Sequence, residues 1–313
     1  MDTGGNAVAP RQRRGGLSRL GGWLFDQPYL LLSLTSLSWA GNTIVGRYAA
    51  GHVPPITLAF IRWGGAFLLL LPFAFRHLAR DWPAIRKHAA FLTLLAATGI
   101  SAYNTFAYYG LQYTTAINGL LLQSTGPLFV ALWTFALFGE HLTLRQTCGI
   151  CTSLSGVIVI VCHGSLAVLL GLAFNRGDVW FLVALFIYGF YTASLRRRPA
   201  MNPISFLAVG MGLGAALLIP GVAVELATGH TLILDTGSYL SFAYVCIFPS
   251  LLGYLFLNRG IELIGANRAA PFMHLTPVFG SVMAVALLGE HFAFYQAVGY
   301  ALVFAGVTIA TKK

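Results

Sequence analysis

The sequence has few charged residues and very few acidic ones. Charged side chains make up 9% of the 313 residues, with 9 Asp and Glu against 19 Lys and Arg, whereas soluble domains average about 25%. Cysteine is also scarce, and no second ligand pair accompanies Cys148 and Cys151 at a zinc-site spacing. No Walker motif is present to bind nucleotide phosphates. This composition excludes an ordinary soluble domain and offers no site for ATP hydrolysis.

Long apolar runs are what the sequence has instead. Hydrophobic residues make up 57% of the chain and occur in stretches of about 20 residues, the length at which a helix crosses ~30 Å of hydrocarbon. The runs are apolar at consecutive positions, which excludes a membrane β-barrel. We expect an all-α integral membrane protein with ten transmembrane helices. The expected spans are 29–49, 55–75, 89–111, 113–138, 143–163, 178–195, 203–225, 239–262, 266–288 and 293–311.

The basic residues indicate orientation. A net charge of +10 is typical of nucleic-acid-binding proteins, but Lys and Arg lie in the N-terminal tail, in alternate connections such as Arg196–Arg198, and at the C-terminal end. The opposite side has Arg176 and, at a span edge, Arg47. By the positive-inside rule we expect both termini in the cytoplasm. No nucleic-acid partner is expected.

The chain repeats itself. Leu137–Gln146 reads LFGEHLTLRQ, and Leu287–Gln296 reads LLGEHFAFYQ. Further identities at this spacing, and at a spacing two residues shorter in the earlier part of each half, make each half a unit of five spans. Because five is odd, the second unit enters the membrane from the opposite side. We therefore expect an inverted five-plus-five repeat. The expected divisions are a cytoplasmic tail over 1–28, a first repeat over 29–163 and a second repeat over 178–313.

Tyr108–Glu140, YYGLQYTTAINGLLLQSTGPLFVALWTFALFGE, and its counterpart Asn258–Glu290, NRGIELIGANRAAPFMHLTPVFGSVMAVALLGE, resemble the helix-turn-helix core of the EamA family of the drug/metabolite transporter superfamily. FIRWGGAFLLLLP, Phe60–Pro72, matches too and places Arg62 where that family often has an arginine. The chain is similar in scale and topology to bacterial YddG-type amino-acid exporters. The resemblance implies a transporter, not an enzyme, that carries small metabolites outward by alternating access and needs no cofactor.

Polar side chains within the spans are candidate site residues, because each is costly in hydrocarbon without a partner. Asn104 with Tyr108, and Tyr254 with Asn258, are four residues apart, so each pair lies on one face of its helix. The repeat exchanges the amide and the phenol between the halves. We expect these pairs to form two walls of a central cavity. Their amide and phenol groups can bind a zwitterionic ligand without carrying a permanent charge themselves. Interhelical hydrogen bonding alone is the alternative interpretation.

Further candidates combine an aromatic ring with a polar group. Trp39 and Asn42 lie one turn apart in the first span, and Tyr188 and Tyr191 lie in the sixth. Their rings are suited to covering the apolar part of a substrate or a cationic head group. Packing, or an aromatic belt at the membrane interface, is the alternative interpretation.

Two spans carry a polar residue just before a proline. Gln123 precedes Pro127 in the fourth span, and His274 precedes Pro277 in the ninth. Each proline frees a backbone carbonyl and loosens its helix at the same depth, which makes the prolines gating candidates. His274 is a substrate-binding candidate with the hypothesis that it senses or transfers protons near neutral pH; a neutral, hydrogen-bonded core histidine is the alternative interpretation.

Four charged residues have gating, coupling or structural interpretations. Arg47 and Arg62 are gating or coupling candidates, and Arg62 either snorkels outward, pairs with a helix C-terminus or attracts anionic substrates. Glu140 and Glu290 end the two repeated segments, where we expect each to cap the next helix rather than to drive proton antiport.

The expected function is a secondary transporter that exports amino acids or related small metabolites. Export of cationic drugs, polyamines or nucleotide-linked metabolites is the alternative. A membrane enzyme is less favoured because no catalytic cluster is present, and a channel or purely structural subunit is a further, less favoured possibility. The expected partners are a small-molecule substrate and the lipid bilayer, with no metal. The seven-residue spacing of glycines, as in Gly149 and Gly156 or Gly299 and Gly306, suits a packed neighbour or a homodimer.

Overall fold

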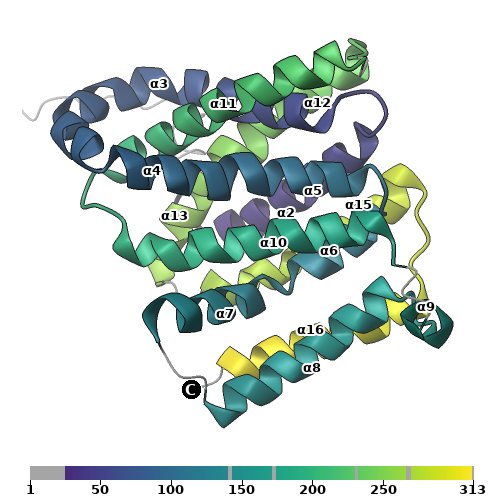
Figure 1. Ribbon diagram of the computed structural model, residues 1–313. Helices are drawn as coiled ribbons and strands as arrows, with labels where there is room; N and C mark the ends of the chain where they lie inside the picture. Colours follow the sequence, from purple (N-terminus) through teal and green to yellow (C-terminus); the bar gives the residue numbers. More distant parts are fainter. Residues whose placement is uncertain (1–24, 140–142, 171–173, 230–231, 266–268, 312–313) are drawn as a thin grey trace, which may run out of the picture.

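The structure is a computed structural model that describes residues 25–139, 143–170, 174–229, 232–265 and 269–311. Over those ranges it is helical and contains no β-strand, which confirms the expected all-α class. Figure 1 shows most helices stacked side by side along one common direction, with α8 and α16 paired at one edge.

The helices divide between the two halves of the chain. The first half contains α2 (Pro28–Tyr48), α3 (Pro55–Lys87), α4 (Ala89–Ala96), η1 (Ala97–Ala102), α5 (Tyr103–Leu111), α6 (Ala116–Gln123), α7 (Gly126–Phe138), α8 (Leu144–Val161) and α9 (Leu166–Leu170). The second half contains α10 (Arg176–Ser194), η2 (Leu195–Arg197), α11 (Pro203–Ala227), α12 (Thr236–Ile247), η3 (Phe248–Leu252), α13 (Gly253–Ile264), η4 (Ala270–His274), α15 (Leu275–Leu288) and α16 (Phe294–Thr311).

Within the described residues, six helices are long and apolar enough to cross a membrane, or seven if the bent pair α6–α7 is one span. The ten expected spans all coincide with helices there, but three fail this test. α2 carries too many polar residues, and the apolar helices Phe272–Leu288 and Phe294–Ile309 are short. The number ten therefore stays a prediction.

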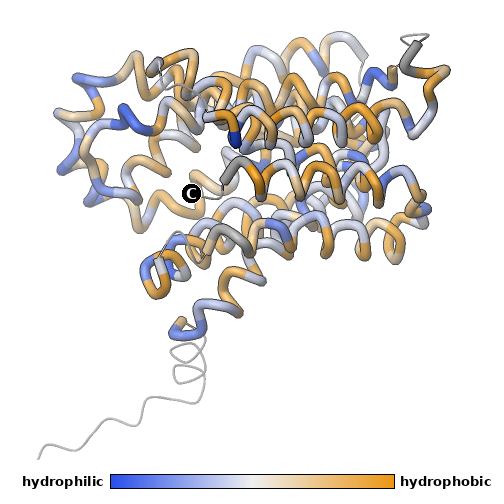
Figure 2. The backbone as a smooth tube through the Cα atoms, turned by 90° about the horizontal axis from the view of Figure 1, so that it is seen from below, coloured by the Kyte–Doolittle hydropathy of each residue, from blue (hydrophilic) through white to orange (hydrophobic). Residues whose placement is uncertain are grey.

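Large apolar side chains remain exposed on the outside of the helices. Leu68, Phe73, Leu240 and Val282 have exposed fractions of 66%, 73%, 66% and 65%. Figure 2 shows hydrophobic residues along most of the helical path and hydrophilic residues gathered at several turns. Such a surface suits hydrocarbon rather than water, so the protein is an integral membrane protein.

Both halves interrupt equivalent helices. A π-helical turn, η1, joins α4 to α5, and another, η3, joins α12 to α13. The chain bends by 41° between α6 and α7, with Pro127 in the first turn of α7. In the second half the 3-10 turn η4 precedes α15, which contains Pro277. Such breaks leave backbone groups that must find partners, and π-helical turns are frequent at functional sites.

Helix contacts occur in matching pairs. α3 packs on α11, and α8 packs on α16. The contact of α10 with α5 is matched by that of α2 with α13, and the contact of α10 with α7 is matched by that of α2 with α15. The contact of α4 with α11 is matched by that of α12 with α3. Exchanging each helix for its repeat counterpart leaves these pairings unchanged.

α3 and α11 run antiparallel. A carboxylate near the end of each helix lies beside the start of the other. Glu225, near the end of α11, accepts hydrogen bonds from the backbone N–H groups of Ile56 and Thr57, both at 2.8 Å, at the start of α3. Asp81, near the end of α3, accepts one from the N–H of Asn202 at 2.9 Å, just before α11. Neither carboxylate was singled out from the sequence.

The spaced glycines form a seam between α8 and α16. A Cβ atom at Gly156 would lie 2.6 Å from the carbonyl oxygen of Gly299, and one at Gly306 would lie 2.5 Å from that of Gly149. Only glycine permits such an approach of two backbones. The predicted glycine faces therefore pack on each other within one chain, and the pairing makes these helices antiparallel as well.

Candidate functional site

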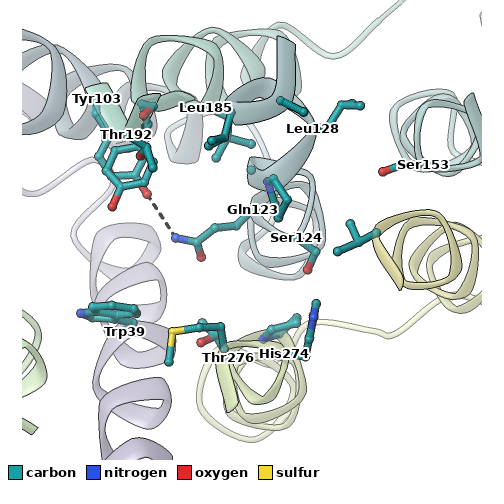
Figure 3. Close-up of a pocket in the computed structure, with 18 of the residues that line it drawn as sticks. Trp39, Tyr103, Gln123, Ser124, Leu128, Ser153, Leu185, Thr192, His274 and Thr276 are labelled. Atoms are coloured by element: carbon teal, nitrogen blue, oxygen red, sulfur yellow. Dashed lines mark hydrogen bonds between the residues drawn. The ribbon is translucent and has the colours of Figure 1, made fainter. Parts of the chain in front are cut away.

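A cavity of about 860 Å³ is lined by residues from both halves of the chain. Its walls come from α2, α3, α5, α6, α7 and α8 in the first half and from α10, α13, η4, α15 and α16 in the second. Figure 3 shows side chains of Trp39, Tyr103, Gln123 and His274 around this space. The volume is that of a site for a small molecule.

Most residues singled out from the sequence lie on this wall. The lining candidates are Trp39, Asn42, Arg62, Asn104, Gln123, Pro127, Tyr188, Tyr254, His274 and Pro277. Tyr108 is buried behind the wall, and Tyr191 lies behind it against Tyr188, with ring centroids 5.5 Å apart. Asn258 is exposed and not part of the lining, and Arg47 lies beside Glu290 instead.

Arg62 is a buried cation on the cavity wall, with an exposed fraction of 5%. Its Nε donates to the Ser250 hydroxyl at 2.9 Å, and its Nη1 donates to Asn104 Oδ1 at 2.7 Å and to the Tyr108 hydroxyl at 3.2 Å. The guanidinium carbon lies 4.6 Å from the centroid of the Trp63 ring. Arg62 therefore neither snorkels outward nor bonds a helix C-terminus.

In each expected pair of amide and phenol, one residue lines the cavity and the other does not. Asn104 lines it, whereas Tyr108 is 2% exposed and donates its hydroxyl hydrogen to Asn42 Oδ1 at 2.7 Å. Tyr254 lines it, whereas Asn258 does not. Both interpretations of the sequence thus apply in α5, where one residue of the pair faces the cavity and the other bonds a neighbouring helix.

Aromatic rings cover one side of the cavity. The rings of Tyr103 and Tyr188 lie 4.5 Å apart, and those of Trp39 and Tyr254 lie 5.9 Å apart. The amide nitrogen of Gln123 donates to the Tyr103 hydroxyl at 3.1 Å, drawn as the dashed line in Figure 3. This wall combines ring faces with hydroxyl and amide groups that carry no charge.

His274 presents its imidazole to the cavity. The ring meets Phe304 edge-on, with centroids 4.9 Å apart, and no described residue hydrogen-bonds to the imidazole. Only its backbone oxygen has a partner, the Tyr300 hydroxyl at 3.3 Å. Among the described residues, His274 therefore does not have the hydrogen bonds of the core histidine that the sequence allowed as an alternative. A proton role for His274 stays a prediction.

Three lining residues have a buried polar atom without a partner. These atoms are Oε1 of Gln123, Oγ of Ser153 and Nε1 of Trp63. An unsatisfied buried polar group costs about 1–3 kcal/mol, so each of these atoms needs a partner that the described residues do not supply. Sequence reasoning missed Ser153 and Trp63, although Trp63 directly follows Arg62 in the FIRW stretch.

Glu290 lies at the end of the molecule at which α6 begins. Its two carboxylate oxygens accept hydrogen bonds from the N–H groups of Ala116 at 2.7 Å and Ile117 at 3.0 Å, and Nε of Arg47 lies 4.0 Å away. Glu290 is therefore a helix cap, but of α6 in the other half rather than of the next helix, α16. Its counterpart Glu140 lies outside the described residues.

A buried polar cluster joins three helices at the same end. Asp178 on α10 has an exposed fraction of 0% and accepts hydrogen bonds from the Thr114 hydroxyl and, at 3.5 Å, from the Asn118 amide. The Asn118 side-chain oxygen on α6 accepts from Gln296 on α16 at 2.7 Å. Sequence analysis missed Asp178 because it lies at the edge of an expected span.

The sequence matches the model of the EamA-like transporter family twice, over residues 27–162 and 175–312. The chain belongs to the EamA-like transporter family. The resemblance stated from the sequence is confirmed, and the two matches fall on the two halves described above. Membership points to a transporter rather than an enzyme.

Relatives over most of the chain are named as transporters. The uncharacterized transporter YyaM of Bacillus subtilis (strain 168) is 28% identical over 90% of this chain and 93% of its own length. A "Probable amino-acid metabolite efflux pump" of Salmonella typhimurium is 26% identical over 89% of this chain and 93% of its own. A "Probable terminal-alkyne amino-acid exporter" of Streptantibioticus cattleyicolor is 27% identical over 75% of each chain.

A solved protein crystal structure shares the fold. It superposes on 91% of this chain and 97% of its own with a TM-score of 0.59, at 17% sequence identity. At that identity the likeness concerns the fold alone.

Proposed function

We propose that this protein is a secondary transporter that exports amino acids or related small metabolites across a bacterial inner membrane by alternating access. Its two halves form an inverted repeat of five helices each, and both termini lie in the cytoplasm. The observation that carries this proposal is an asymmetry between equivalent residues of the two halves.

Gln146 and Gln296 occupy the same position in the repeated decapeptides but have different surroundings. Gln296 is 2% exposed and donates to Asn118 at 2.7 Å, whereas Gln146 lines the cavity. Two turns further on, Ser153 lines the cavity and its counterpart Val303 does not, although both are buried, with exposed fractions of 1% and 0%. One end of the repeat is thus packed, and the equivalent end faces a cavity.

Such an asymmetry is what one state of an alternating-access carrier requires, because the opposite state exchanges the two ends. The matched helix contacts and the antiparallel pairs α3–α11 and α8–α16 support a two-fold relation between the halves. With the termini in the cytoplasm, the Glu290 end faces the exterior. The cavity then reaches toward the cytoplasm, past Gln146 and Arg196.

The charges on the cavity wall favour substrates with a carboxylate. Arg62 and Arg196 line the cavity, and among the described lining residues there is no Asp or Glu. A polyamine or a cationic drug would meet the buried cation Arg62, which has no described carboxylate within 4.0 Å. Two relatives named as exporters or efflux pumps of amino acids or amino-acid metabolites add support for this substrate class.

The test is flux in proteoliposomes that contain the purified full chain. We expect saturable uptake of radiolabelled neutral amino acids, accelerated by the same amino acid on the far side of the membrane, and no such acceleration with spermidine or a nucleotide sugar. Protein-free liposomes are the control for leakage. Linear uptake of every amino acid by correctly inserted protein would contradict the proposal.

A further inference from the structure

We infer that Arg62 is the carboxylate-binding residue of the cavity, and that its Nη2 nitrogen is the group that contacts the substrate. The inference rests on the proposed function and names the substrate group that the cavity recognises.

A guanidinium has five N–H donors. In Arg62 the single N–H of Nε bonds to Ser250, and Nη1 bonds to Asn104 and Tyr108. Nη2 has two N–H groups, and no described residue accepts a hydrogen bond from them. Because Arg62 lines the cavity, these donors are available to a ligand.

The bonded side of the guanidinium is held in one orientation. Ser250 donates its own hydrogen to the carbonyl of Val245 at 2.8 Å, and the Asn104 amide donates to the carbonyl of Ile100 at 2.8 Å. Each side chain therefore presents a lone pair to Arg62. Ser250 lies in η3, and Ile100 lies in η1, so the irregular turns of both halves fix the arginine.

The charge of Arg62 lacks a counter-ion among the described residues. Its three hydrogen-bond acceptors are neutral, and no described carboxylate lies within 4.0 Å of it. A buried, unpaired guanidinium is costly, and a carboxylate is the group that its planar pair of donors fits best. A ligand carboxylate would complete the site and supply the missing charge.

The same cavity contains an acceptor for the other charge of a zwitterion. Oε1 of Gln123 is buried without a partner, because the amide nitrogen is already bonded to Tyr103. A neutral oxygen bonds an ammonium group without attracting free cations strongly. The ligand class is therefore an α-amino acid or a similar small monocarboxylate, with its side chain against the aromatic wall.

The test uses L-leucine, L-phenylalanine and L-threonine, each paired with its carboxamide, which keeps the ammonium group and loses the carboxylate. Binding to the detergent-solubilised full chain is followed by the ligand-induced rise in Tm and by the fluorescence of Trp39 and Trp63, which line the cavity. We expect each acid that binds to do so at least tenfold more tightly than its amide. This comparison needs no substitution, so it holds even if variants fold poorly.

Arg62→Gln should remove the preference for acid over amide, and Arg62→Lys should keep part of it. Arg259→Gln is the matched control, because Arg259 lies outside the cavity and pairs with Asp26 and Glu262; it should keep the full preference. Equal binding of acids and amides by the unsubstituted protein, or an unchanged preference in folded Arg62→Gln, would overturn the inference.

The outcomes separate this inference from the proposed function. Saturable amino-acid flux with equal competition by the amides would leave the transporter intact and refute the role of Arg62. A clear acid preference in binding, lost in Arg62→Gln but without any flux, would leave the carboxylate site intact and refute export. Absence of any acid-induced change in Tm and fluorescence would refute the carboxylate site.

Discussion

At the scale of single residues, three carboxylates each hold the start of a helix that belongs to the other half. Glu225 bonds the start of α3, Asp81 bonds the residue before α11, and Glu290 bonds the start of α6. The chain has only 9 acidic residues, and these three bind helix starts. The first N–H groups of a helix have no partner within it, and a carboxylate there also meets the positive end of the helix dipole.

Replacing Glu290 with Gln should destabilise the closed end. The amide keeps one acceptor oxygen but loses the second, together with the charge that faces the α6 amides and Arg47. We expect a loss of about 1 kcal/mol in the free energy of unfolding. Mixed-detergent denaturation of the purified protein measures it.

Glu262→Gln is the control for Glu290→Gln. Glu262 pairs with Arg259 on the surface, with a side chain that is 68% exposed, and surface pairs contribute little. We therefore expect its denaturation midpoint to stay close to that of the unsubstituted protein. Equal midpoints for both variants would show that the Glu290 cap contributes nothing.

Residue types at the site were largely predictable, but their roles were not. Asn104, Tyr254 and Gln123 could be found because a polar side chain is rare in an apolar span. The partner of Glu290 could not be found, because the sequence places it beside α16 whereas its bonds are to Ala116 and Ile117 in the other half. Contacts between halves depend on the packing of whole helices, which local patterns do not contain.

At the scale of helices, the seam between α8 and α16 depends on the absence of side chains. The backbones of these helices approach where glycines face one another, at Gly149 with Gly306 and Gly156 with Gly299. Between membrane helices there is little hydrophobic driving force, so close van der Waals contact of this kind supplies the stability.

Gly156→Ala should weaken the seam. The added Cβ would lie 2.6 Å from the Gly299 oxygen and 2.8 Å from the Val303 nitrogen, and neither backbone can yield without moving α16. We expect a loss of roughly 1–3 kcal/mol in the free energy of unfolding, measured by mixed-detergent denaturation.

Gly64→Ala, within α3, is the matched control. Its nearest atom would be the Cβ of Ala215 at 3.9 Å, an ordinary contact. Alanine has the higher helix propensity, so this variant should be as stable as the unsubstituted protein or more stable, by up to about 1 kcal/mol. A Gly156→Ala protein as stable as the Gly64→Ala protein would contradict the close seam.

Helix positions followed from hydropathy, and helix ends and breaks did not. The expected span 55–75 ends where the apolar run ends. α3 continues as far as Lys87, so the charged segment after Phe75 is helical too. The π-helical turns η1 and η3 were not predicted from the sequence. One of them contacts a neighbouring helix, because the Ser101 hydroxyl in η1 donates to the carbonyl of Gly214 in α11 at 2.8 Å.

At the scale of the whole molecule, the closed end and the cavity belong to one proposed state. Gln296, Asn118 and Asp178 join α16, α6 and α10 at the closed end. Their bonds must break if that end is to open, and the free energy for this must come from contacts formed at the other end. The proposed binding of substrate at Arg62 and Gln123, on walls from α3 and α6, would change the balance between the two ends.

Cross-linking the closed end should therefore stop transport without stopping binding. Asn118 and Gln296, whose side chains bond at 2.7 Å, are replaced with Cys in a background in which the 4 native cysteines are Ser. A short bis-methanethiosulfonate reagent then joins the two positions. We expect flux to fall at least tenfold, while binding of amino acids through the cavity in detergent stays within about twofold, because the cavity belongs to the state that is locked.

Reduction of the cross-link should restore flux, and each single-cysteine variant treated with the same reagent should keep it, since neither holds two helices together. Undiminished flux through quantitatively cross-linked protein would mean that α6 and α16 do not separate during transport. In that case the buried bonds of Gln296 would be permanent structure, and the asymmetry between Gln146 and Gln296 would no longer support alternating access.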